Sequence, residues 1–498
     1  MSDKKTAISP TRSENYSEWY QQVIRAAELA ESAPIHGCMI IKPWGYALWE
    51  NIQSNLDKKI KETNHENIYC PLFIPISYFE KEAQHISGFA KECAVVTHHR
   101  LEVNEEGKLI PAAPLEEPLI VRPTSETTMG EAFARWIHSY RDLPLLINQW
   151  ANIVRWEMRP RLFLRTTEFL WQEGHTAHET EQDALEETLR MLDVYEHFAQ
   201  DYLAMPVIKG MKTENEKFPG AVSTYCIEAM MQDGKALQAG TSHLLGQNFS
   251  KAFNIQFLNA KGEKEHVWTT SWGVSTRLIG GLIMTHSDDD GLIVPPRIAP
   301  LHAVILPVTH QHKASEAIHA YCEALANEMR SLTYHGQPIR VKVDTKDKNP
   351  GEKAWYWRKK GVPLRIEIGP REYEAKNVFL KQRDQANNQT QNLSKEEFLN
   401  SLPSLLDTIQ KTLFERAKQF QKEHSKFIRS ANEFYDYFKN QQGFAYTYWA
   451  GDGALEDQLK KEYGITIRCL PLSESENKGQ CIFTGKPNAK VAIFAKAY

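Results

Sequence analysis

The sequence of 498 residues has little of what would assign it to a specialised class. Its seven cysteines form no CxxC pair and no dense framework, which indicates free thiols in a reducing compartment. No run of about 18 apolar residues occurs, so no membrane span is expected. The polar start, "MSDKKTAISPTRSENYSEWY", lacks the apolar stretch of a secretory signal. We therefore expect a cytoplasmic protein.

An excess of positive charge is also missing. The formal net charge is −4, so any nucleic-acid site must be a local basic patch. Neither glycine-rich nucleotide loop, GxxxxGK[ST] or GxGxxG, is present. A nucleotide site would have to be built from sheet-borne arginines instead. The length exceeds what one hydrophobic core holds and predicts about two to four domains.

Apolar spacing and punctuation residues give a coarse organisation. "VPPRIAP" at 294–300 predicts a domain boundary, and the strands and helices that alternate after it predict a compact α/β domain. The tail after 439 has the pattern of an irregular segment with few strands. Helices are predicted over 16–32, 44–61, 181–203 and 402–439, and strands over 118–122, 144–157, 165–171, 266–271 and 292–294, with a glycine-rich helix between the last two.

One stretch, "RWEMRPRLFLRTTEFLWQEGHTAH" (155–178), combines four arginines with aromatic residues. It fits an antiparallel hairpin with a loop at about 158–164. Guanidinium groups bind phosphates, aromatic rings stack on bases, and a carboxylate accepts from an exocyclic amine. The pattern alone equally supports a nucleotide site and a surface hairpin with cross-strand ion pairs. Side chains of a strand alternate between its two faces. On the first strand Arg155 and Glu157 therefore share a face, and on the second strand Arg165, Thr167, Phe169 and Trp171 share a face.

At this hairpin the sequence resembles the class II aminoacyl-tRNA synthetases. Their motif 2 has an Arg-x-Glu pair, here Arg155-Trp156-Glu157. "HGCMIIKPWGYALWENIQ", with Pro43, resembles motif 1, and "SWGVSTRLIGGLIM", with Arg277, resembles motif 3. Within this class the chain resembles the prolyl-tRNA synthetases over almost its full length, through "RPTSET", "FLWQEGHTAH", "GTSHLLGQNF", "GLIVPPRIAP", "GVPLRIEIGPRE" and the terminal "FAKAY".

The resemblance implies three domains. They are an α+β catalytic core with an antiparallel sheet flanked by helices (1–296), an α/β anticodon-binding domain (297–400) and a small α/β C-terminal domain (401–498). About 100 residues separate motifs 2 and 3, too few for the editing domain of many bacterial members. With the C-terminal tyrosine, this indicates the archaeal or eukaryote-like type, without built-in editing of mischarged alanine. Motif 1 implies a homodimer.

The implied reaction has two steps. Proline attacks the α-phosphate of ATP to give prolyl-adenylate and pyrophosphate, and the terminal ribose of tRNA(Pro) then takes the prolyl group. By resemblance, Arg155 bridges the α-phosphate and the proline carboxylate, and Arg277 contacts the γ end. Gln238 and Glu228 are the implied magnesium ligands. The implied ATP site comprises Arg155, Glu157 (adenine amine), Arg165, Phe169 (stacked on adenine), Gln238, Thr241, Ser275 and Arg277.

Proline is a secondary amine, so its site needs acceptors for two N–H groups. Thr124 and Glu126 offer a hydroxyl and a carboxylate, although this segment also fits a helix cap. By resemblance Trp171, His175 and His243 shape the slot for the ring, with Arg155 at the carboxylate. Without the resemblance, the two histidines fit core positions better. A slot of this kind rejects smaller ligands poorly, so mischarging of alanine and cysteine is expected.

Some segments depart from the family or have no assigned role. Members usually have tryptophan at 352 and glutamate at 358, whereas this chain has Glu352 and Arg358, which removes an expected anticodon contact. Related tails bind zinc through four cysteines, and here only Cys481 matches, so we expect no structural zinc. "HSDDDGL" (286–292) lacks calcium-loop spacing and is interpreted as a solvated turn. Arg159 and Arg161 are assigned to the tRNA acceptor end or to pyrophosphate.

Two other functions compete with this interpretation. The first is a synthetase-like protein that binds tRNA or an amino acid without activating it, against which the intact set of Arg155, Glu157, Gln238 and Arg277 argues. The second is an enzyme that activates proline for another acceptor. The anticodon-binding domain argues against it, while the arginine at 358 keeps it open.

Overall fold

The computed structural model describes residues 7–80, 92–309 and 315–498. Its largest sheet has the order β22-β23-β26-β24-β9-β10-β11-β14-β8-β7-β3, and β25 pairs with β26. Neighbouring strands are antiparallel except in the β3–β7 and β22–β23 pairs. This agrees with the predicted antiparallel sheet of the core. Its first part comprises β3 (Glu66–Asn67), β7 (Leu145–Val154), β8 (Glu168–His178), β9 (Val207–Met211), β10 (Ser223–Met230), β11 (Ala236–Gly246) and β14 (Trp268–Ser275).

Helices cover this sheet and close its core. Apolar side chains surround α8, so the helix is buried among the other elements. Pro43 begins α2, where its missing N–H leaves no bond unmade. The predicted helix over 16–32 ends early, because its last three residues form β1, which pairs with β2. The helices are α1 (Tyr16–Ala26), α2 (Pro43–Lys61), α3 (Ile76–Glu80), α5 (Glu126–Trp136), α6 (Glu181–Asp201), α7 (Asn248–Ala252) and α8 (Arg277–His286), and the two short strands are β1 (Ala30–Ser32) and β2 (Met39–Ile41).

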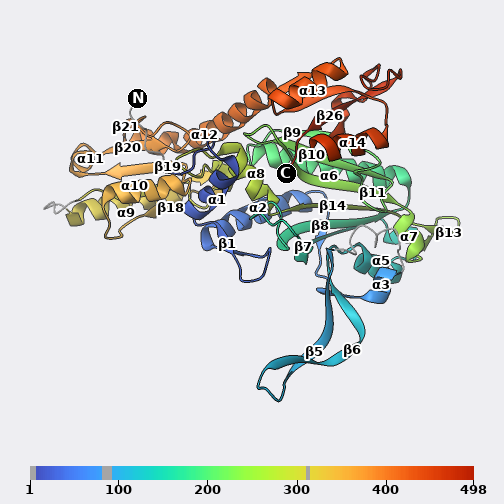
Figure 1. The fold of residues 1–498 in the computed structure, drawn as a ribbon. Helices are drawn as coiled ribbons and strands as arrows, with labels where there is room; N and C mark the ends of the chain where they lie inside the picture. Colours follow the sequence, from blue (N-terminus) through green and yellow to red (C-terminus); the bar gives the residue numbers. More distant parts are fainter. Residues whose placement is uncertain (1–6, 81–91, 310–314) are drawn as a thin grey trace.

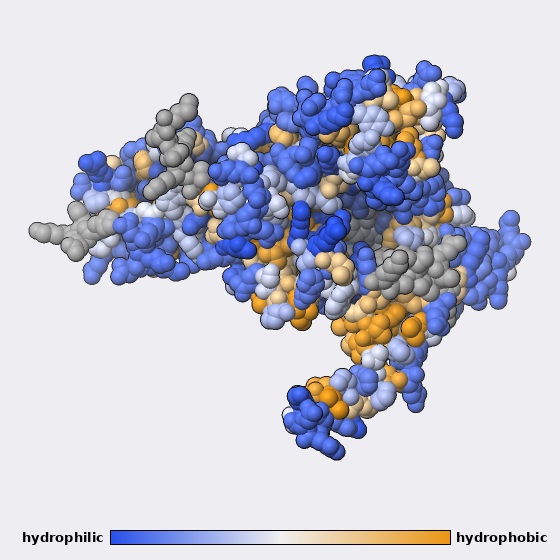
Figure 2. All heavy atoms as spheres, viewed as in Figure 1, coloured by the Kyte–Doolittle hydropathy of each residue, from blue (hydrophilic) through white to orange (hydrophobic). Residues whose placement is uncertain are grey.

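A long hairpin projects from the core (Figure 1). Figure 2 shows hydrophobic surface along it, and Val95, Leu101, Val103, Leu109 and Ile110 are exposed there. It comprises β5 (Ala94–Val103) and β6 (Leu109–Val121), with β4 (Phe73–Pro75) at its base. A smaller hairpin comprises β12 (Gln256–Leu258) and β13 (Lys264–His266). In the part of the chain that is described, no helix is long and apolar enough to cross a bilayer.

The α/β region after the proline-rich break has the alternating order that its sequence predicts. Its sheet runs β18-β15-β19-β20-β21, parallel on both sides of β15 and antiparallel beyond β19. Its elements are β15 (Ala303–Pro307), α9 (Ser315–Ser331), β16 (Thr333–Tyr334), β17 (Gln337–Pro338), β18 (Val341–Val343), α10 (Pro350–Lys359), β19 (Leu364–Ile368), α11 (Pro370–Ala375), β20 (Asn377–Gln382), β21 (Gln391–Ser394) and α12 (Lys395–Glu423).

The C-terminal region differs from its prediction. The expected helix over 402–439 is two helices, α12 and α13, with β22 between them. The expected strand-poor tail contributes strands that continue the catalytic sheet, because Leu470 and Pro471 of β24 pair with β9 (Figure 1). The elements are β22 (Ser425–Phe427), α13 (Ala431–Asn440), β23 (Phe444–Trp449), α14 (Gly453–Tyr463), β24 (Thr466–Pro471), β25 (Lys478–Gly479) and β26 (Ala489–Ala495).

The segment 286–292 contains a turn, as predicted, but the turn is not simply solvated, because Asp288 and Asp290 join the core to the α/β region. Asp288 pairs with Arg383, with distances of 2.8 and 2.5 Å, and Asp290 pairs with Arg358 at 2.9 Å. Asp289 pairs with Arg12 at 3.4 Å. The predicted strand over 292–294 does not form, because Leu292 donates its N–H to the carbonyl of Lys359 beyond the sheet. We call the ion pairs of Asp288, Asp289 and Asp290 the aspartate junction.

Candidate functional site

Two adjoining cavities, of about 290 and 180 Å³, lie on the central sheet. Their common wall consists of Arg155, Phe169, Ser275 and Arg277. Within the described residues, the two cavities bring together every predicted site residue except Glu228. The larger is also lined by Thr124, Glu126, Trp171, His175, Gln238, Thr241 and His243. The smaller is also lined by Glu157 and Arg165.

Strand β8 supplies one side of the larger cavity. Phe169, Trp171, Glu173 and His175 all line it, because alternate residues of a strand share a face. The predicted parity of 169, 171 and 175 is therefore confirmed. The hairpin itself is shorter than predicted: β7 ends at Val154 and β8 begins at Glu168. Arg155, Glu157 and Arg165 thus lie in the connection rather than on strands.

The chain leaves the ladder at that point because its bonding partners change. Arg155 still donates its N–H to Thr167 O at 2.8 Å, but Trp156 donates its N–H to Glu92 O at 2.7 Å. The connection then turns back through a backbone bond from Arg161 to Arg165 at 2.6 Å. The charged residues of the predicted hairpin therefore reach the cavity from an irregular loop. The periodicity of the sequence does not predict the path of such a loop.

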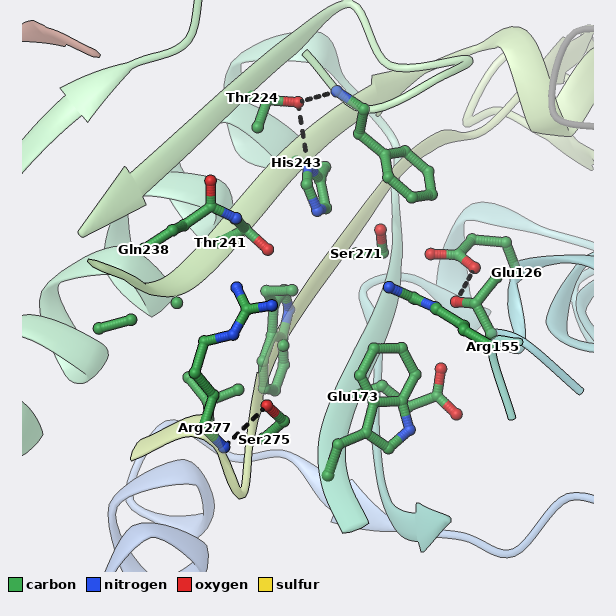
Figure 3. Close-up of a pocket in the computed structure, with 18 of the residues that line it drawn as sticks. Glu126, Arg155, Glu173, Thr224, Gln238, Thr241, His243, Ser271, Ser275 and Arg277 are labelled. Atoms are coloured by element: carbon green, nitrogen blue, oxygen red, sulfur yellow. Dashed lines mark hydrogen bonds between the residues drawn. The ribbon is translucent and has the colours of Figure 1, made fainter. Parts of the chain in front are cut away.

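Arg155 and Arg277 reach the cavity from different elements (Figure 3). Arg155 Nε donates to Pro123 O at 3.0 Å, and its guanidinium carbon lies 5.4 Å from the centre of the Trp171 ring. Arg277 Nε donates to Leu164 O at 3.1 Å. Burial, followed by the charges of Arg165 and Arg155, lowers the pKa of Arg277 to about 10. Three guanidinium groups around the two adjoining cavities favour an anionic ligand.

Glu126 lies beside Arg155 and away from Arg277 (Figure 3), and Thr124 lines the same cavity. Thr124 and Glu126 are both buried, and the Thr124 hydroxyl donates to the Glu126 carboxylate. Ser271 Oγ lies in the same wall, buried and without a hydrogen-bond partner among the described residues. A carboxylate, a hydroxyl pair and an arginine around one small space suit a ligand with both an amine and a carboxylate.

The two predicted histidines differ in electrostatics. Burial would lower the pKa of His175, but the hydrogen bond to Glu173 and the charges of Glu173 and Glu126 raise it overall. Burial lowers the pKa of His243 to about 4, and its Nδ1 lies 3.0 Å from the hydroxyl of Thr224. His175 therefore favours the charged form and His243 the neutral one.

Glu173 holds this end together, and sequence reasoning did not single it out. Its carboxylate accepts from the Ser125 N–H at 3.1 Å, the Ser125 hydroxyl at 2.5 Å and Gln149 Nε2 at 2.8 Å. His175 Nε2 lies 3.0 Å from it. Its parity on β8 matches that of Trp171 and His175, which was the available signal. A carboxylate with four such partners orients the residues around it.

The predicted magnesium ligands separate in the structure. Gln238 and Thr241 line the larger cavity. Glu228 lines neither cavity and is fully buried, where Lys212 Nζ binds it at 2.8 Å and Arg468 at 3.1 Å. These cations lower the pKa of Glu228 against the effect of burial. Because Lys212 and Arg468 already match its charge, we leave Glu228 out of the proposed metal site.

The end of the chain lies against the motif 2 connection. Arg165 donates to the backbone oxygen of Tyr498 at 3.3 Å, and the Tyr498 hydroxyl donates to Asp233 at 2.6 Å. The guanidinium carbon of Arg161 lies 5.9 Å from the centre of the Tyr498 ring. Arg161 thus has a neighbour within the chain, and no described contact tests its assignment or that of Arg159 to tRNA or pyrophosphate.

Comparison with known proteins agrees with this site. Residues 109–286 match the family described as tRNA synthetase class II core domain (G, H, P, S and T), 302–405 match the anticodon binding domain, and 431–498 match the prolyl-tRNA synthetase C-terminal family. The chain is 56% identical to "Proline--tRNA ligase 2" of Anaeromyxobacter dehalogenans, over 100% of both chains. It is 56% identical to "Proline--tRNA ligase" of Bdellovibrio bacteriovorus, over 99% of both.

The chain belongs to the prolyl-tRNA synthetase family. A further relative, "Proline--tRNA ligase" of Flavobacterium johnsoniae, is 52% identical over 98% of this chain and 99% of its own. Membership of the prolyl-tRNA synthetases confirms the predicted fold class and the assignment as an enzyme with proline–tRNA ligase activity. The domain boundaries at 296 and 400 stay predictions, as do the individual roles of the site residues.

Proposed function

We propose that the two cavities bind the substrates of proline activation, with L-proline in the larger and the adenosine and phosphates of ATP extending into the smaller. The observation that carries this proposal is the common wall, where Arg155 and Arg277 face both spaces. A reaction between two ligands needs them in adjoining sites, with cations where negative charge develops.

At the amino-acid end, Thr124 and Glu126 accept the two N–H groups of the proline ammonium. Trp171, His175 and His243 surround the ring, and Ser271 is added to this set because its buried hydroxyl has no hydrogen-bond partner in the described part of the chain. Glu173 orients His175 and the segment that carries Thr124. Arg155 binds the proline carboxylate and the α-phosphate together, so that the carboxylate oxygen approaches phosphorus in line with the leaving pyrophosphate.

At the nucleotide end, Phe169 stacks on adenine and Glu157 accepts from its amine. Arg165, Ser275 and Arg277 bind the phosphates, and Arg277 contacts the γ end. No side chain acts as a covalent nucleophile in this scheme. Catalysis therefore comes from positioning and from cationic stabilisation of the transition state.

Class II synthetases generally use ATP with Mg²⁺, and the cavity offers oxygen donors for it. Magnesium is commonly held by substrate phosphates together with few protein ligands, and it neutralises phosphate charge when bound. Gln238 and Thr241 would supply those ligands through side-chain oxygens. We propose no structural zinc in the C-terminal region. Elemental analysis that finds one zinc per chain would overturn that part.

We also propose a homodimer and binding of tRNA(Pro) by the α/β region. Ile35, Ile40 and Tyr46 around Pro43 are exposed, as expected of a surface that a second copy covers. On α10, Trp355 is partly exposed, whereas Arg358 is buried in the aspartate junction. Arg358 is therefore assigned to the junction rather than to anticodon reading. Sedimentation that gives a monomer mass would contradict the dimer.

The test is proline-dependent exchange of pyrophosphate into ATP, followed by charging of tRNA(Pro). We expect exchange with proline, weaker exchange with alanine or cysteine, and charging at the tRNA 3′ end. Absence of exchange with proline would contradict the proposal. Exchange without charging would point to an acceptor other than tRNA.

A further inference from the structure

The segment between β9 and β10 (residues 212–222) forms part of the cavity wall. Lys217, Phe218 and Pro219 all line the larger cavity. The Phe218 ring lies 4.5 Å from the ring of His243, centre to centre. Its N–H donates to the Thr224 hydroxyl at 2.9 Å, and that hydroxyl also bonds His243 (Figure 3). A shift of Phe218 would therefore move both the wall and the histidine behind it.

The first half of the same segment is bound to the C-terminal region. The Thr213 hydroxyl donates to Glu456 Oε1 at 2.8 Å, and Asn215 Nδ2 donates to Gly453 O at 3.0 Å. Glu216 pairs with Lys460 at 2.8 Å. Positions 453, 456 and 460 all lie on α14 and repeat at helical spacing. One face of α14 thus holds residues 213–216, the last of which also lines the larger cavity.

The bond between Thr213 and Glu456 is the strongest candidate among these contacts. Both side chains are buried, at 4% and 3% exposure, so water competes little for the bond. The exposed pair of Glu216 and Lys460 contributes less, since surface ion pairs are weak. Burial raises the pKa of Glu456, the Thr213 hydrogen bond and the Lys460 charge oppose that rise, and the Glu216 and Asp457 charges add to it.

Holding the two regions together does not require α14. Strand β24 already joins the catalytic sheet through its pairing with β9, and Lys212 Nζ donates to Arg468 O at 2.7 Å. The segment between β9 and β10 is bound to strands at both ends, where Lys212 donates its N–H to Thr224 O and Val222 donates its N–H to Leu244 O, each at 2.8 Å. What α14 adds is the position of residues 213–216, between these two bonds.

We propose that α14 positions residues 217–219 against the amino-acid end of the cavity and so sets the affinity for proline. Glu456 is a positioning residue that acts through Thr213. The C-terminal region thereby takes part in amino-acid binding without contacting the ligand. This inference rests on the proposed function for the identity of that ligand.

The test is a double-mutant cycle of Thr213→Val and Glu456→Ala in proline-dependent pyrophosphate exchange. Each variant should raise the proline KM by about three- to tenfold, the range that one hydrogen bond supports. The ATP KM and kcat should stay within about twofold of the unmodified chain. The double variant should be no worse than the poorer single one, because both remove the same bond.

Matched variants separate positioning from general damage. Thr213→Ser keeps the hydroxyl and should restore the proline KM. Lys461→Ala, at an exposed position beside Lys460 on α14, should have no effect, while Lys460→Ala should have a small one. Unchanged proline KM in both Thr213→Val and Glu456→Ala would overturn the inference. Equal increases in the KM of proline and of ATP would also overturn it. If the unmodified chain shows no proline exchange, the proposed function fails instead.

Discussion

The cavity and the aspartate junction both concentrate arginines, yet the charges around them are arranged differently. At the junction, Arg383 and Arg358 each bind an aspartate. In the cavity, Arg277 bonds a backbone carbonyl, and no carboxylate in the described ranges forms an ion pair with it. The junction matches its arginines within the chain, whereas Arg277 faces the cavity without such a partner in the described ranges.

The pKa directions follow from this difference. Burial would raise the pKa of Asp288, but the charge and hydrogen bonds of Arg383 outweigh it and lower the pKa. Arg277 has burial and two neighbouring arginines acting in the same direction, so its pKa falls to about 10. Matched charges stabilise one geometry, whereas a buried arginine with no carboxylate partner among the described residues marks a place where a ligand supplies the negative charge.

The largest expected effect is on the cavity side. Arg155→Ala should abolish proline-dependent pyrophosphate exchange, and Arg277→Ala should lower kcat/KM by about 100-fold or more, because each removes cationic stabilisation of the transition state. The melting temperature of Arg277→Ala should not fall, since burial of its charge is unfavourable without ATP. Near-normal exchange in Arg155→Ala would overturn its assigned role.

The two cavity histidines should titrate far apart. His175 should titrate above 6.5, and His243 at about 4, so that only His175 is charged between these values. Imidazole proton shifts in an NMR titration measure both pKa values, with His175→Gln and His243→Gln to assign the signals. Closely similar pKa values would remove the electrostatic contrast proposed here.

At the junction, loss of a matched partner should reduce stability rather than chemistry. Arg383→Ala leaves the half-buried Asp288 without its partner and should destabilise the fold by about 2 kcal/mol. Exchange activity measured well below the melting temperature should remain. Arg371→Ala, an exposed change on α11, is the control and should leave the melting temperature unaltered. If Arg383→Ala lost exchange activity but kept its melting temperature, the junction would serve the chemistry rather than the stability of the fold, against this prediction.

The smallest effect is expected at the end of the chain, where Tyr498 contacts both Arg165, which lines the smaller cavity, and Asp233. Tyr498→Phe removes the hydroxyl bonded to Asp233 but keeps the backbone oxygen that Arg165 contacts. It should cost about 1 kcal/mol of stability. The ATP KM should change by no more than about twofold, because Arg165 keeps its contact. A tenfold higher ATP KM would show that the ring also fixes Arg165.

Much of the site could be predicted because it lies on regular elements or in long motifs. Phe169, Trp171 and His175 share one face of β8, as strand alternation predicts, and Arg277 begins a buried apolar helix. The placement of Arg155, Glu157 and Arg165 on strands was wrong, since the connection leaves the ladder where Trp156 bonds Glu92. The alternation of residue types predicts a strand, but it does not show at which residue the pairing with the neighbouring strand stops.

The sequence by itself determined the family, the order of the catalytic motifs and the face of β8 that lines the cavity. Each of these depends on residues close together in the chain. Only the tertiary structure decided which charges face the cavity. Glu228 is neutralised by Arg468, 240 positions away, and Asp288 by Arg383, 95 positions away. Whether a buried charge is matched depends on which distant segments fold against it, and local spacing does not encode that.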